Sequence, residues 1–365
     1  MSLSLNAKLG ISAGGLVCGA VTVWLGVWWS LTQPAAIGTS AQTIERANTI
    51  IAAEAVAATT DVLVSRHSDG VLVSAGTENT WPIALMIENA AFGGVRPQSG
   101  LGSAQVIYEL PVEGGITRFL ALFAGELPNK IGPIRSARPT YLEFSSEYDA
   151  LFGHAGGSPE ALEAVDGLAV KDLSGLGVDA RFFFRDGTLV APHNLFTSGE
   201  LLTKAREAKG LTEAEPTYEP WLFKEDTPVN DPTVEPLQID FGSGPLYAVD
   251  YTYNPKTNSY DRANGGETQT DAVDGEVLSP KTVIVQIVPA AILAGDEGRV
   301  NYDLTGSGKL YLAQDGLVTE GTWGKVDRSS RTIFRDADGN RLALNRGQIW
   351  ISIVPTSGTI TLPSE

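Results

Sequence analysis

The sequence predicts a mixed α/β domain at residues 78–211, a smaller, mainly antiparallel β domain at 237–365 and one N-terminal transmembrane helix. Three observations lead to this prediction. Residues 9–31 form an uncharged, apolar stretch. Strand-length apolar runs then alternate with helix-start signals up to residue 211. After a segment rich in Pro, Glu and Asp at 212–236, short β runs follow one another between turn dipeptides.

The N-terminal apolar stretch is long enough to cross a membrane. As a helix it would extend roughly 34 Å, and a hydrocarbon core is about 30 Å thick. Trp28 and Trp29 lie at its outer end, where interfacial tryptophans are expected, and Lys8 flanks its inner end. We therefore expect a cytoplasmic tip at 1–8, a cell-membrane anchor at 9–31 and an extracytoplasmic body.

Two other interpretations of this stretch stay open. A cleavable signal peptide typically has an apolar run of about 7–15 residues and a better small-residue site than Thr39-Ser40-Ala41. A lipoprotein signal would need a small residue before its cysteine, whereas Cys18 follows Leu16-Val17. Cys18 is the only cysteine, so the body forms no internal disulfide and has no thiol nucleophile.

The composition excludes several classes of partner. The formal net charge of −17 argues against a general surface for nucleic acid or anionic lipid. The body has no cysteine to bind zinc, and residues 32–365 contain neither a Gly-x-Ser-x-Gly elbow nor a His-Glu-x-x-His motif. We therefore expect no metal, no cofactor and no nucleic acid, and the oligomeric state stays open.

Residues 32–77 predict a stalk between the anchor and the body. Its stretch from Ala41 to Ala58 has a helical composition, but its apolar face is mostly alanine and buries little by itself. Asp69-Gly70 predicts a turn, and we interpret His67 as solvated. The folded body is expected to start near Trp81.

Three apolar runs of strand length open the mixed α/β domain: Pro82 to Ile87, Gln105 to Leu110 and Arg118 to Ala124. The third is apolar on both faces from Phe119 onward, which predicts a central strand. The segment from Pro111 to Ile116 is short enough to join the second and third runs as a hairpin.

Helix signals follow in the same domain. Pro139 opens a segment with Tyr141, Phe144 and Tyr148 at helical spacing. Ala150 to Phe152 predicts a short strand. Ser158-Pro159-Glu160 then predicts a helix start, with serine as N-cap and proline in the first turn.

The rest of the chain reads as a linker and a β domain. Residues 212–236 predict an interdomain linker with one strand around Trp221 to Phe223. In the β domain we expect strands at Tyr247 to Tyr253 and Val283 to Val288, and turns at Asp315-Gly316, Asp338-Gly339 and Arg346-Gly347.

The segment from Gly132 to Pro139 is the first candidate for chemistry. Arg135 and Arg138 stand three residues apart between two prolines. In a helical turn such a pair would share a face and clamp one carboxylate or phosphate. The alternative is that each arginine pairs with an acidic neighbour such as Glu143 or Glu147.

The segment from Gly153 to Glu160 is the second candidate. A strand end, the Gly156-Gly157 turn and the helix start at Ser158 would leave backbone N–H groups and a positive dipole end at one point, which favours an anion. His154 could donate to that anion or act as general base, and a buried structural role is the alternative.

Further candidates complete the expected site. His193-Asn194, Glu113 and Arg118 are predicted to lie near the same region of the sheet. His154 and Glu113 are the candidates for a catalytic base. The predicted ligand-binding residues are Arg118, Arg135, Arg138, His154, Gly156, Gly157, Ser158, His193 and Asn194.

Several stretches together resemble one known family. The stretches are Ile83 to Asn89, Arg96 to Gly100, Glu113 to Phe119, Gly132 to Pro139, His154 to Pro159 and Pro192 to Asn194. In this order they resemble the signature blocks of the YerB-like family, domain of unknown function 3048, which is found in bacterial envelope proteins and lipoproteins. The resemblance covers about residues 66–355. It implies an N-terminal α/β domain, a smaller C-terminal domain and no established activity.

Three functions are compatible with these patterns. The lead hypothesis is a membrane-anchored extracytoplasmic protein that binds an anionic cell-envelope glycan or phosphoglycan, because basic groups and glycine turns concentrate in one part of an acidic chain. One alternative is a transferase or hydrolase acting on a phosphate-linked envelope glycopolymer, with His154 or Glu113 as base. The other is an envelope scaffold protein, which would show a large exposed apolar patch and no convergent pocket.

Overall fold

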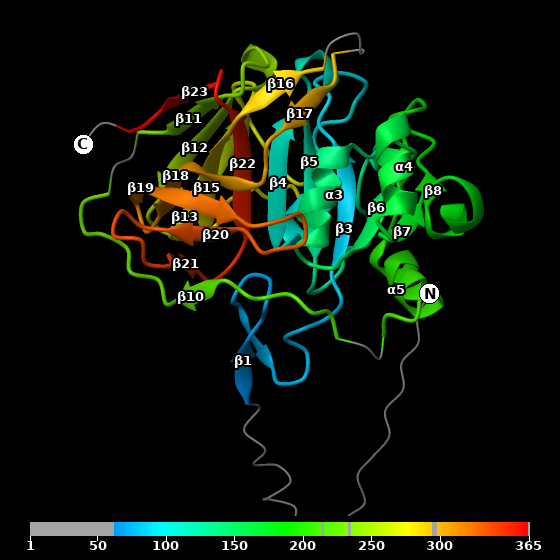
Figure 1. The fold of residues 1–365 in the computed structure, drawn as a ribbon, viewed down its shortest axis with the longest axis horizontal. Helices are drawn as coiled ribbons and strands as arrows, with labels where there is room; N and C mark the ends of the chain where they lie inside the picture. Colours follow the sequence, from blue (N-terminus) through cyan, green and yellow to red (C-terminus); the bar gives the residue numbers. More distant parts are fainter. Residues whose placement is uncertain (1–61, 213–214, 233–234, 294–297, 364–365) are drawn as a thin grey trace, which may run out of the picture. The chain divides into compact units, whose positions relative to one another are not determined.

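A computed structural model describes residues 62–212, 215–232, 235–293 and 298–363 (Figure 1). No helix within these residues is long and apolar enough to span a membrane. The predicted anchor at 9–31, the tip before it and the first part of the stalk lie outside the described residues.

A ten-stranded sheet runs through the described body (Figure 1). Its strands lie in the order β20 (Ile333–Arg335), β19 (Leu317–Lys325), β18 (Gly306–Gln314), β15 (Thr282–Val288), β22 (Ile349–Pro355), β4 (Val106–Pro111), β5 (Thr117–Phe123), β3 (Ile83–Glu88), β6 (Leu151–His154) and β7 (Lys171–Ser174). β22 pairs in parallel with β4, with Ile349 opposite Val106. Strands from both sides of the segment 212–236 therefore share one hydrogen-bonded sheet.

A second, five-stranded sheet comes from the C-terminal part of the chain. It lies in the order β14 (Glu267–Thr268), β13 (Ser259–Asn264), β12 (Val249–Asn254), β11 (Leu237–Asp240) and β23 (Thr359–Thr361). Its pairs are antiparallel, as the sequence predicts. The pairing of β15 with β22 is parallel, so the C-terminal strands are not antiparallel throughout.

Short two-stranded ladders and a few helices complete the described fold. The ladders are β1 (Leu63–Ser65) with β2 (Leu72–Ser74), β8 (Phe184–Arg185) with β9 (Leu195–Phe196), β10 (Leu222–Lys224) with β21 (Ala343–Asn345), and β16 (Ala290–Ile292) with β17 (Val300–Tyr302). The helices are α3 (Pro139–Ser146), α4 (Pro159–Gly167) and α5 (Gly199–Ala208), with 3₁₀ turns η1 (Leu101–Ser103), η2 (Glu113–Gly115), η3 (Gly177–Phe182) and η4 (Pro245–Tyr247).

The local predictions for the first strands and for α4 are confirmed. β4 and β5 form an antiparallel hairpin, and β5 lies between β4 and β3 with every residue buried. Ser158 caps α4, because its Oγ accepts a hydrogen bond from the Ala161 N–H at 3.3 Å. Helix α5 was not predicted, although Ser198 caps it in the same way.

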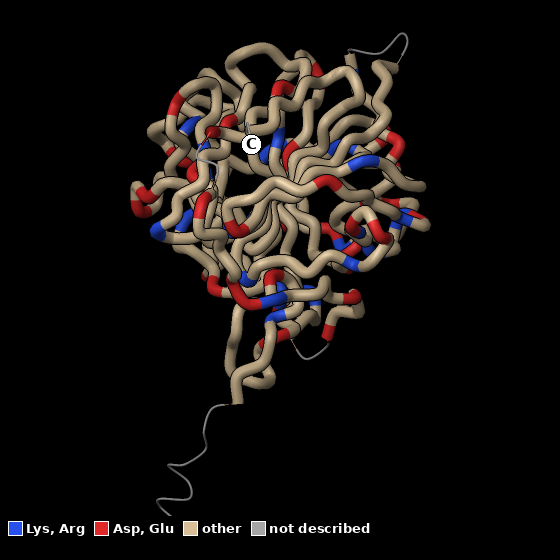
Figure 2. Tube along the Cα trace, turned by 90° about the vertical axis from the view of Figure 1, so that its left-hand side faces the viewer, with Lys and Arg blue, Asp and Glu red and all other residues tan. Residues whose placement is uncertain are grey.

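Charged side chains of both signs surround these elements. In the view of Figure 2, acidic and basic residues lie interspersed around the outside. Exposed pairs such as Lys309 with Glu320, 2.7 Å apart, are part of this pattern. Such exposed pairs contribute little stability, because water screens their charges.

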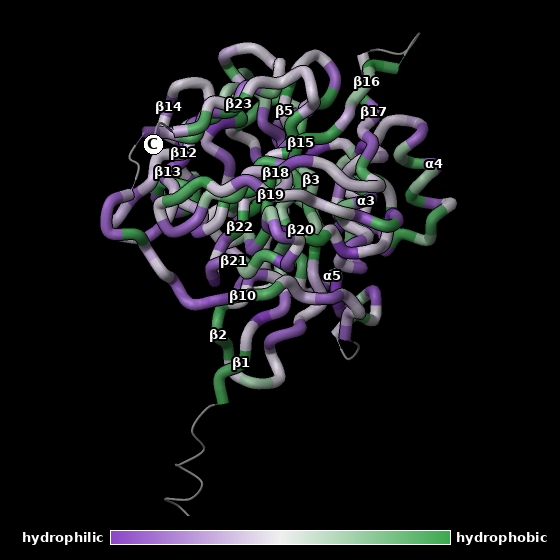
Figure 3. Tube along the Cα trace, turned by 60° about the vertical axis from the view of Figure 1, so that its left-hand side comes forward, coloured by the Kyte–Doolittle hydropathy of each residue, from purple (hydrophilic) through white to green (hydrophobic). Residues whose placement is uncertain are grey.

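The large sheet buries side chains on two faces, because successive residues of a strand point to opposite sides. On the first, Ile107 and Phe119 belong to a core that includes residues of the second sheet. On the other, which we call the helix face, Leu110 and Leu120 belong to a core with residues of α3 and α4. Figure 1 shows α3 in front of this sheet, and Figure 3 shows hydrophobic segments running through its strands.

The last part of the predicted stalk contacts the body. Residues 62–77 contain the β1–β2 hairpin, and Arg346 Nη1 donates to the Gly70 carbonyl at 2.7 Å. His67 is half-buried, with its ring edge-on to Tyr218, so the expectation that it is solvated is wrong. The contact with Tyr218 shields part of this ring from water.

Candidate functional site

Charged residues gather at the edge of the large sheet where several of its strands end. β3, β4 and β6 run in the same direction, so their carboxyl ends meet there. In open α/β sheets ligands bind in a crevice outside these ends. Glu88 ends β3, Glu113 follows β4, and Arg118 lies near the start of the antiparallel strand β5.

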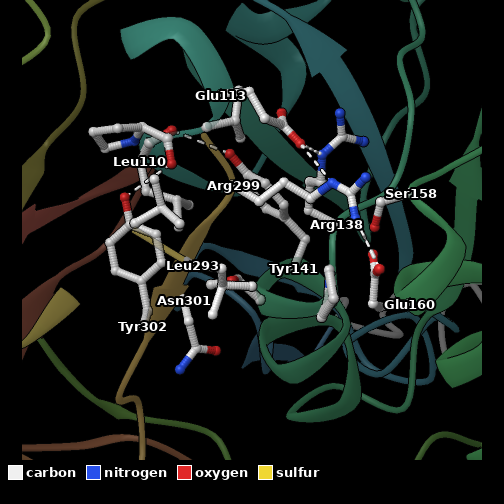
Figure 4. A pocket seen from close by; sticks show the side chains of 15 residues that line it. Leu110, Glu113, Arg138, Tyr141, Ser158, Glu160, Leu293, Arg299, Asn301 and Tyr302 are labelled. Carbon is white, nitrogen blue, oxygen red and sulfur yellow. Dashed lines mark hydrogen bonds and ion pairs between the residues drawn. The ribbon is translucent and has the colours of Figure 1, made fainter. Parts of the chain in front are cut away.

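Beside this edge lies a pocket of about 190 Å³ between the end of β4, the starts of α3 and α4, and β17 (Figure 4). We call it the helix-face pocket. Its lining combines charged groups with apolar walls, and consists of Leu110, Pro111, Val112, Glu113, Arg138, Pro139, Thr140, Tyr141, Ser158, Glu160, Leu293, Arg299, Val300, Asn301 and Tyr302.

Two arginines and two glutamates are paired in this pocket (Figure 4). Arg138 Nε donates to Glu113 Oε1. Arg299 Nη1 donates to both carboxylate oxygens of Glu160, at 2.8 and 2.7 Å, and Arg299 Nε lies 3.9 Å from Glu113 Oε1. The carboxylate of Glu113 therefore lies between two guanidinium groups.

The surroundings of Glu113 favour its ionised form. Burial by itself raises the pKa of this carboxyl, but the hydrogen bond and charge of Arg138 outweigh it and hold the pKa below the ordinary value. Glu113 is therefore a carboxylate at neutral pH and cannot serve as a general acid there.

The hydroxyls of the two tyrosines in the pocket donate hydrogen bonds to backbone carbonyls. Tyr302 donates to the Pro111 carbonyl at 2.8 Å, and Tyr141 donates to the Arg118 carbonyl at 2.8 Å. Burial raises the pKa of both phenols, so both stay protonated. Their rings act as walls of the pocket.

Arg118 lies behind the pocket and not in its lining. Its side chain is buried, and Nη1 donates to the Ser136 carbonyl at 2.8 Å. Burial, and then the charge of Arg138, lower the pKa of Arg118 to about 10, so the guanidinium stays charged at neutral pH. Its charge also helps to keep Glu113 ionised.

Arg135 and His193 form a separate cluster around Glu88. Arg135 Nε lies 3.2 Å from Glu88 Oε1, and His193 Nδ1 lies 3.0 Å from both Glu88 oxygens. Glu88 is 3% exposed, and Phe92 stands edge-on to the His193 ring. None of these residues lines the helix-face pocket.

The expectation that Arg135 and Arg138 share the face of a helical turn is wrong. Arg138 is extended, with φ −134° and ψ 149°, and α3 begins only after it. The segment before it pairs through isolated bridges, with Ile134 opposite Ile87 and Ala137 beside Gly157. An extended backbone sends the two guanidiniums to different carboxylates.

His154 has both ring nitrogens engaged away from the pocket. It is 1% exposed, Nδ1 donates to the Gly156 carbonyl at 2.7 Å, and Nε2 lies 2.7 Å from Asp172 Oδ1. The same Gly156 carbonyl accepts from the Ala137 N–H at 2.8 Å. The ring therefore holds the glycine turn against the segment that carries the arginines.

The remaining predicted residues divide between pocket and loop. Ser158 lines the helix-face pocket, whereas Gly156 and Gly157 do not. Asn194 Oδ1 accepts from Arg185 Nη1 at 2.7 Å, and its Nδ2 donates to the Leu189 carbonyl at 3.3 Å. Asn194 therefore stabilises its own loop and does not line the helix-face pocket.

Two charged residues of the region were missed by sequence reasoning. Arg299 reaches Glu160 across 139 residues of chain, and no local pattern signals such a contact. Glu88 had a signal, because a charged residue that ends a fully apolar strand stands where site residues are often found. Within the described part of the chain, no group of three or more His, Cys, Asp or Glu is placed to hold a metal ion.

Comparisons with known proteins show the family. The family model described as "Protein of unknown function (DUF3048) N-terminal domain" matches residues 70–212, and the model of the C-terminal domain of the same family matches residues 237–351. The chain is 34% identical over 277 residues to "Putative lipoprotein YerB" of Bacillus subtilis (strain 168), which covers 75% of this chain and 81% of that protein. The crystal structure of YerB protein from Bacillus subtilis is similar with a TM-score of 0.72 and 31% identity, over 81% of this chain and 99% of that one. The resemblance seen in the sequence is confirmed, and the chain belongs to the YerB-like DUF3048 family.

Proposed function

We propose that this chain is a membrane-tethered extracytoplasmic protein that binds an anionic group of a cell-envelope glycan or phosphoglycan in the helix-face pocket. One observation carries the proposal. Glu113 is held between the guanidiniums of Arg138 and Arg299, inside a pocket whose other walls are largely apolar.

The carboxylate of Glu113 occupies a position that an external anion would compete for. A guanidinium binds carboxylate and phosphate through the same planar pair of N–H donors. Partial burial strengthens such bonds, because fewer water molecules screen the charges. A ligand anion can therefore replace Glu113 as partner of Arg138, while its uncharged part lies against the apolar walls.

Two further observations support the proposed location. The apolar stretch at 9–31 predicts a membrane anchor. The relative in Bacillus subtilis is named a putative lipoprotein, which is also a membrane-tethered class. Both favour a body held at the outer face of the cell membrane, where envelope glycans are within reach.

The geometry gives less support to the alternatives. A transferase or hydrolase would use His154 or Glu113 as base, but His154 has both ring nitrogens engaged and Glu113 is paired with Arg138. A scaffold would not need a pocket with convergent charges. Binding is therefore the function that we put forward.

Calorimetric titration of the full-length chain, in detergent, with an anionic cell-wall glycopolymer tests the proposal. Arg138→Ala should weaken binding about tenfold or more, since a hydrogen bond to a charged group contributes ~1.5–3 kcal/mol. Arg341→Ala removes an exposed pair with Glu219 and is the matched control, expected to leave binding unchanged. Equal affinity in the Arg138→Ala variant and the unaltered chain would contradict the proposal.

Glu113→Gln separates the binder from the enzyme. If Glu113 competes with the ligand for the arginines, its neutralisation should tighten binding severalfold. If Glu113 is a catalytic base, the same change should abolish turnover of the polymer and leave affinity unchanged. Polymer cleavage or transfer that disappears in Glu113→Gln would favour the enzyme.

A further inference from the structure

The opposite face of the large sheet carries a second polar region at the same edge. Glu88 and Arg118 point to the helix face, so their chain neighbours Asn89 and Thr117 point to the other side. There Asn89 Nδ2 donates to Thr117 Oγ1 at 2.7 Å and to Asn264 Oδ1 at 3.1 Å. Asn264 belongs to β13, so this contact links the large sheet to the second one.

A pocket of about 360 Å³ opens above these residues. We call it the amide pocket. It is lined by Ala91, Arg96, Pro97, Leu246, Asn264, Gly265, Glu267, Thr268, Gln269 and Thr270. It shares no lining residue with the helix-face pocket.

A chain of hydrogen bonds fixes which atoms the amides present. Arg96 can only donate, and its Nε donates to Asn89 Oδ1 at 2.9 Å. Gln98 Nε2 donates to the same Oδ1 at 2.9 Å and to the Glu88 carbonyl at 3.0 Å. Gln98 Oε1 is therefore an acceptor, and Gln269 Nε2 donates to it at 2.9 Å.

This order leaves one acceptor in the pocket lining without a donor. Gln269 is 5% exposed, and its Oε1 accepts no hydrogen bond from the described residues. A rotation of the Gln269 amide would not give its oxygen a donor, because that oxygen would then face the Gln98 oxygen. A buried acceptor left without a donor destabilises the folded state. A ligand that donates to Gln269 Oε1 removes this destabilisation.

Arg96 supplies donors to the same pocket. Three of its N–H groups are used, by the Asn89 side chain, the Asn89 carbonyl and the Leu246 carbonyl. Arginine has five N–H donors, so two remain for a ligand. The guanidinium lies over the ring of Tyr247, 5.1 Å from its centre, and is thereby held in place.

These two groups select the charge of the ligand. A fully deprotonated anion such as sulfate could accept from Arg96 but has no hydrogen to donate to Gln269. A cation could donate to Gln269 but would be repelled by Arg96. Glu267 also lines the pocket, but its side chain is exposed, so water screens the charge of its carboxylate. A neutral group that both donates and accepts fits best.

We propose that the amide pocket binds a neutral sugar unit. One hydroxyl donates to Gln269 Oε1 while a neighbouring hydroxyl accepts from Arg96, since each sugar hydroxyl can do both. Ala91, Pro97 and Leu246 offer apolar surface to the C–H groups of the ring. This inference does not rest on the helix-face pocket and goes beyond the anion binding proposed for it.

Saturation-transfer NMR on the full-length chain tests this site with glucose as the observed ligand, and with sulfate and a blocked dipeptide amide as competitors. We expect saturable binding of glucose that sulfate does not displace. Gln269→Met keeps the length of the side chain, removes the acceptor and should abolish glucose binding. Gln348→Leu, which removes a half-buried amide elsewhere, is the control and should retain it.

Ala91→Leu is the second test, because it fills the pocket without changing the amide chain. It should also abolish glucose binding, with an unchanged circular dichroism spectrum. Arg138→Ala should leave glucose binding intact, which separates this site from the helix-face pocket. The proposal is overturned if no glucose binding is detected, if it persists in both Gln269→Met and Ala91→Leu, or if the dipeptide competes in place of the sugar.

Discussion

Single buried polar side chains hold the loops of this chain together, and Asp315 shows this best. It occupies the turn between β18 and β19 with φ 57°, a conformation that Asp, Asn and Gly tolerate. Its carboxylate pairs with Lys224 Nζ and accepts from Asn258 Nδ2 at 2.9 Å and Asn345 Nδ2 at 2.7 Å. The segment around Lys224 is thus fixed to this turn. Burial opposes the charge, but these hydrogen bonds outweigh it and lower the pKa of Asp315.

At the residue scale we predict that Asp315→Asn destabilises the chain by about 1–3 kcal/mol at pH 7, because asparagine keeps the turn but loses the charged hydrogen bonds. The folded pKa is lowered, so the stabilising contribution is complete above the unfolded value of about 3.9 and is lost as pH falls below it. Urea unfolding at pH 7 and pH 3 measures both effects. Asp338→Asn, in an exposed turn, is the control. An equal loss in both variants, or a loss that grows in acid, would contradict this role.

At the scale of elements, the end of α3 is joined to β19 by a buried charge cluster. Glu147 lies 2.5 Å from Lys325 Nζ and 3.6 Å from Arg331 Nη1, and all three side chains are at most 3% exposed. Glu147 Oε1 also accepts from Thr332 Oγ1 at 2.7 Å. Arg331 lies over the ring of Trp221, 3.6 Å from its centre. One carboxylate therefore connects a helix of the N-terminal part with a strand of the C-terminal part.

We predict that Glu147→Gln lowers the free energy of unfolding by about 3–5 kcal/mol, because two buried cations lose their anion. Glu143→Gln on the same helix is the control. Burial raises the pKa of Glu143, so its charge is already disfavoured, and its neutralisation should cost little. Urea denaturation followed by tryptophan fluorescence measures both. If the two variants unfold at the same urea concentration, the cluster does not stabilise the junction.

At the scale of the whole described body, the two sequence segments matched by the family are parts of one sheet. β22 separates β15 from β4, and Glu109 of β4 pairs with Arg262 of β13 at 2.5 Å. Both of these side chains are fully buried. Trp350 Nε1 also donates to Glu109, at 3.3 Å. Removal of the C-terminal part would expose the apolar edge of β4 and leave Glu109 as an unpaired buried charge.

We therefore predict that a chain ending at residue 211 does not fold cooperatively and aggregates, because an uncovered apolar edge strand pairs with other chains. Circular dichroism on heating and limited proteolysis measure this. A chain ending at Pro355 removes only β23, an edge strand of the second sheet, and should keep a single sharp transition. A protected, cooperative body from the chain that ends at 211 would show that the N-terminal part is autonomous.

Structural features that a few neighbouring residues specify were predicted from the sequence. The apolar run of β5, the hairpin with β4, the Ser158 cap and the Asp315-Gly316 turn depend on periodicity, capping and turn chemistry, which neighbouring residues specify. The expectation that Arg135 and Arg138 share the face of a helical turn is wrong, because backbone bridges to Ile87 and Gly157 hold that segment extended.

Only the tertiary structure decided which charges meet. Arg299 reaches Glu160 across 139 residues, and Arg262 reaches Glu109 across 153. The sequence by itself indicated the family, the starts of α3 and α4 and the concentration of basic residues in one region. It could not show that His154 and Asn194 hold loops while Arg138 and Glu113 line a pocket. The direction of each side chain depends on strand order and register, which long-range pairing sets.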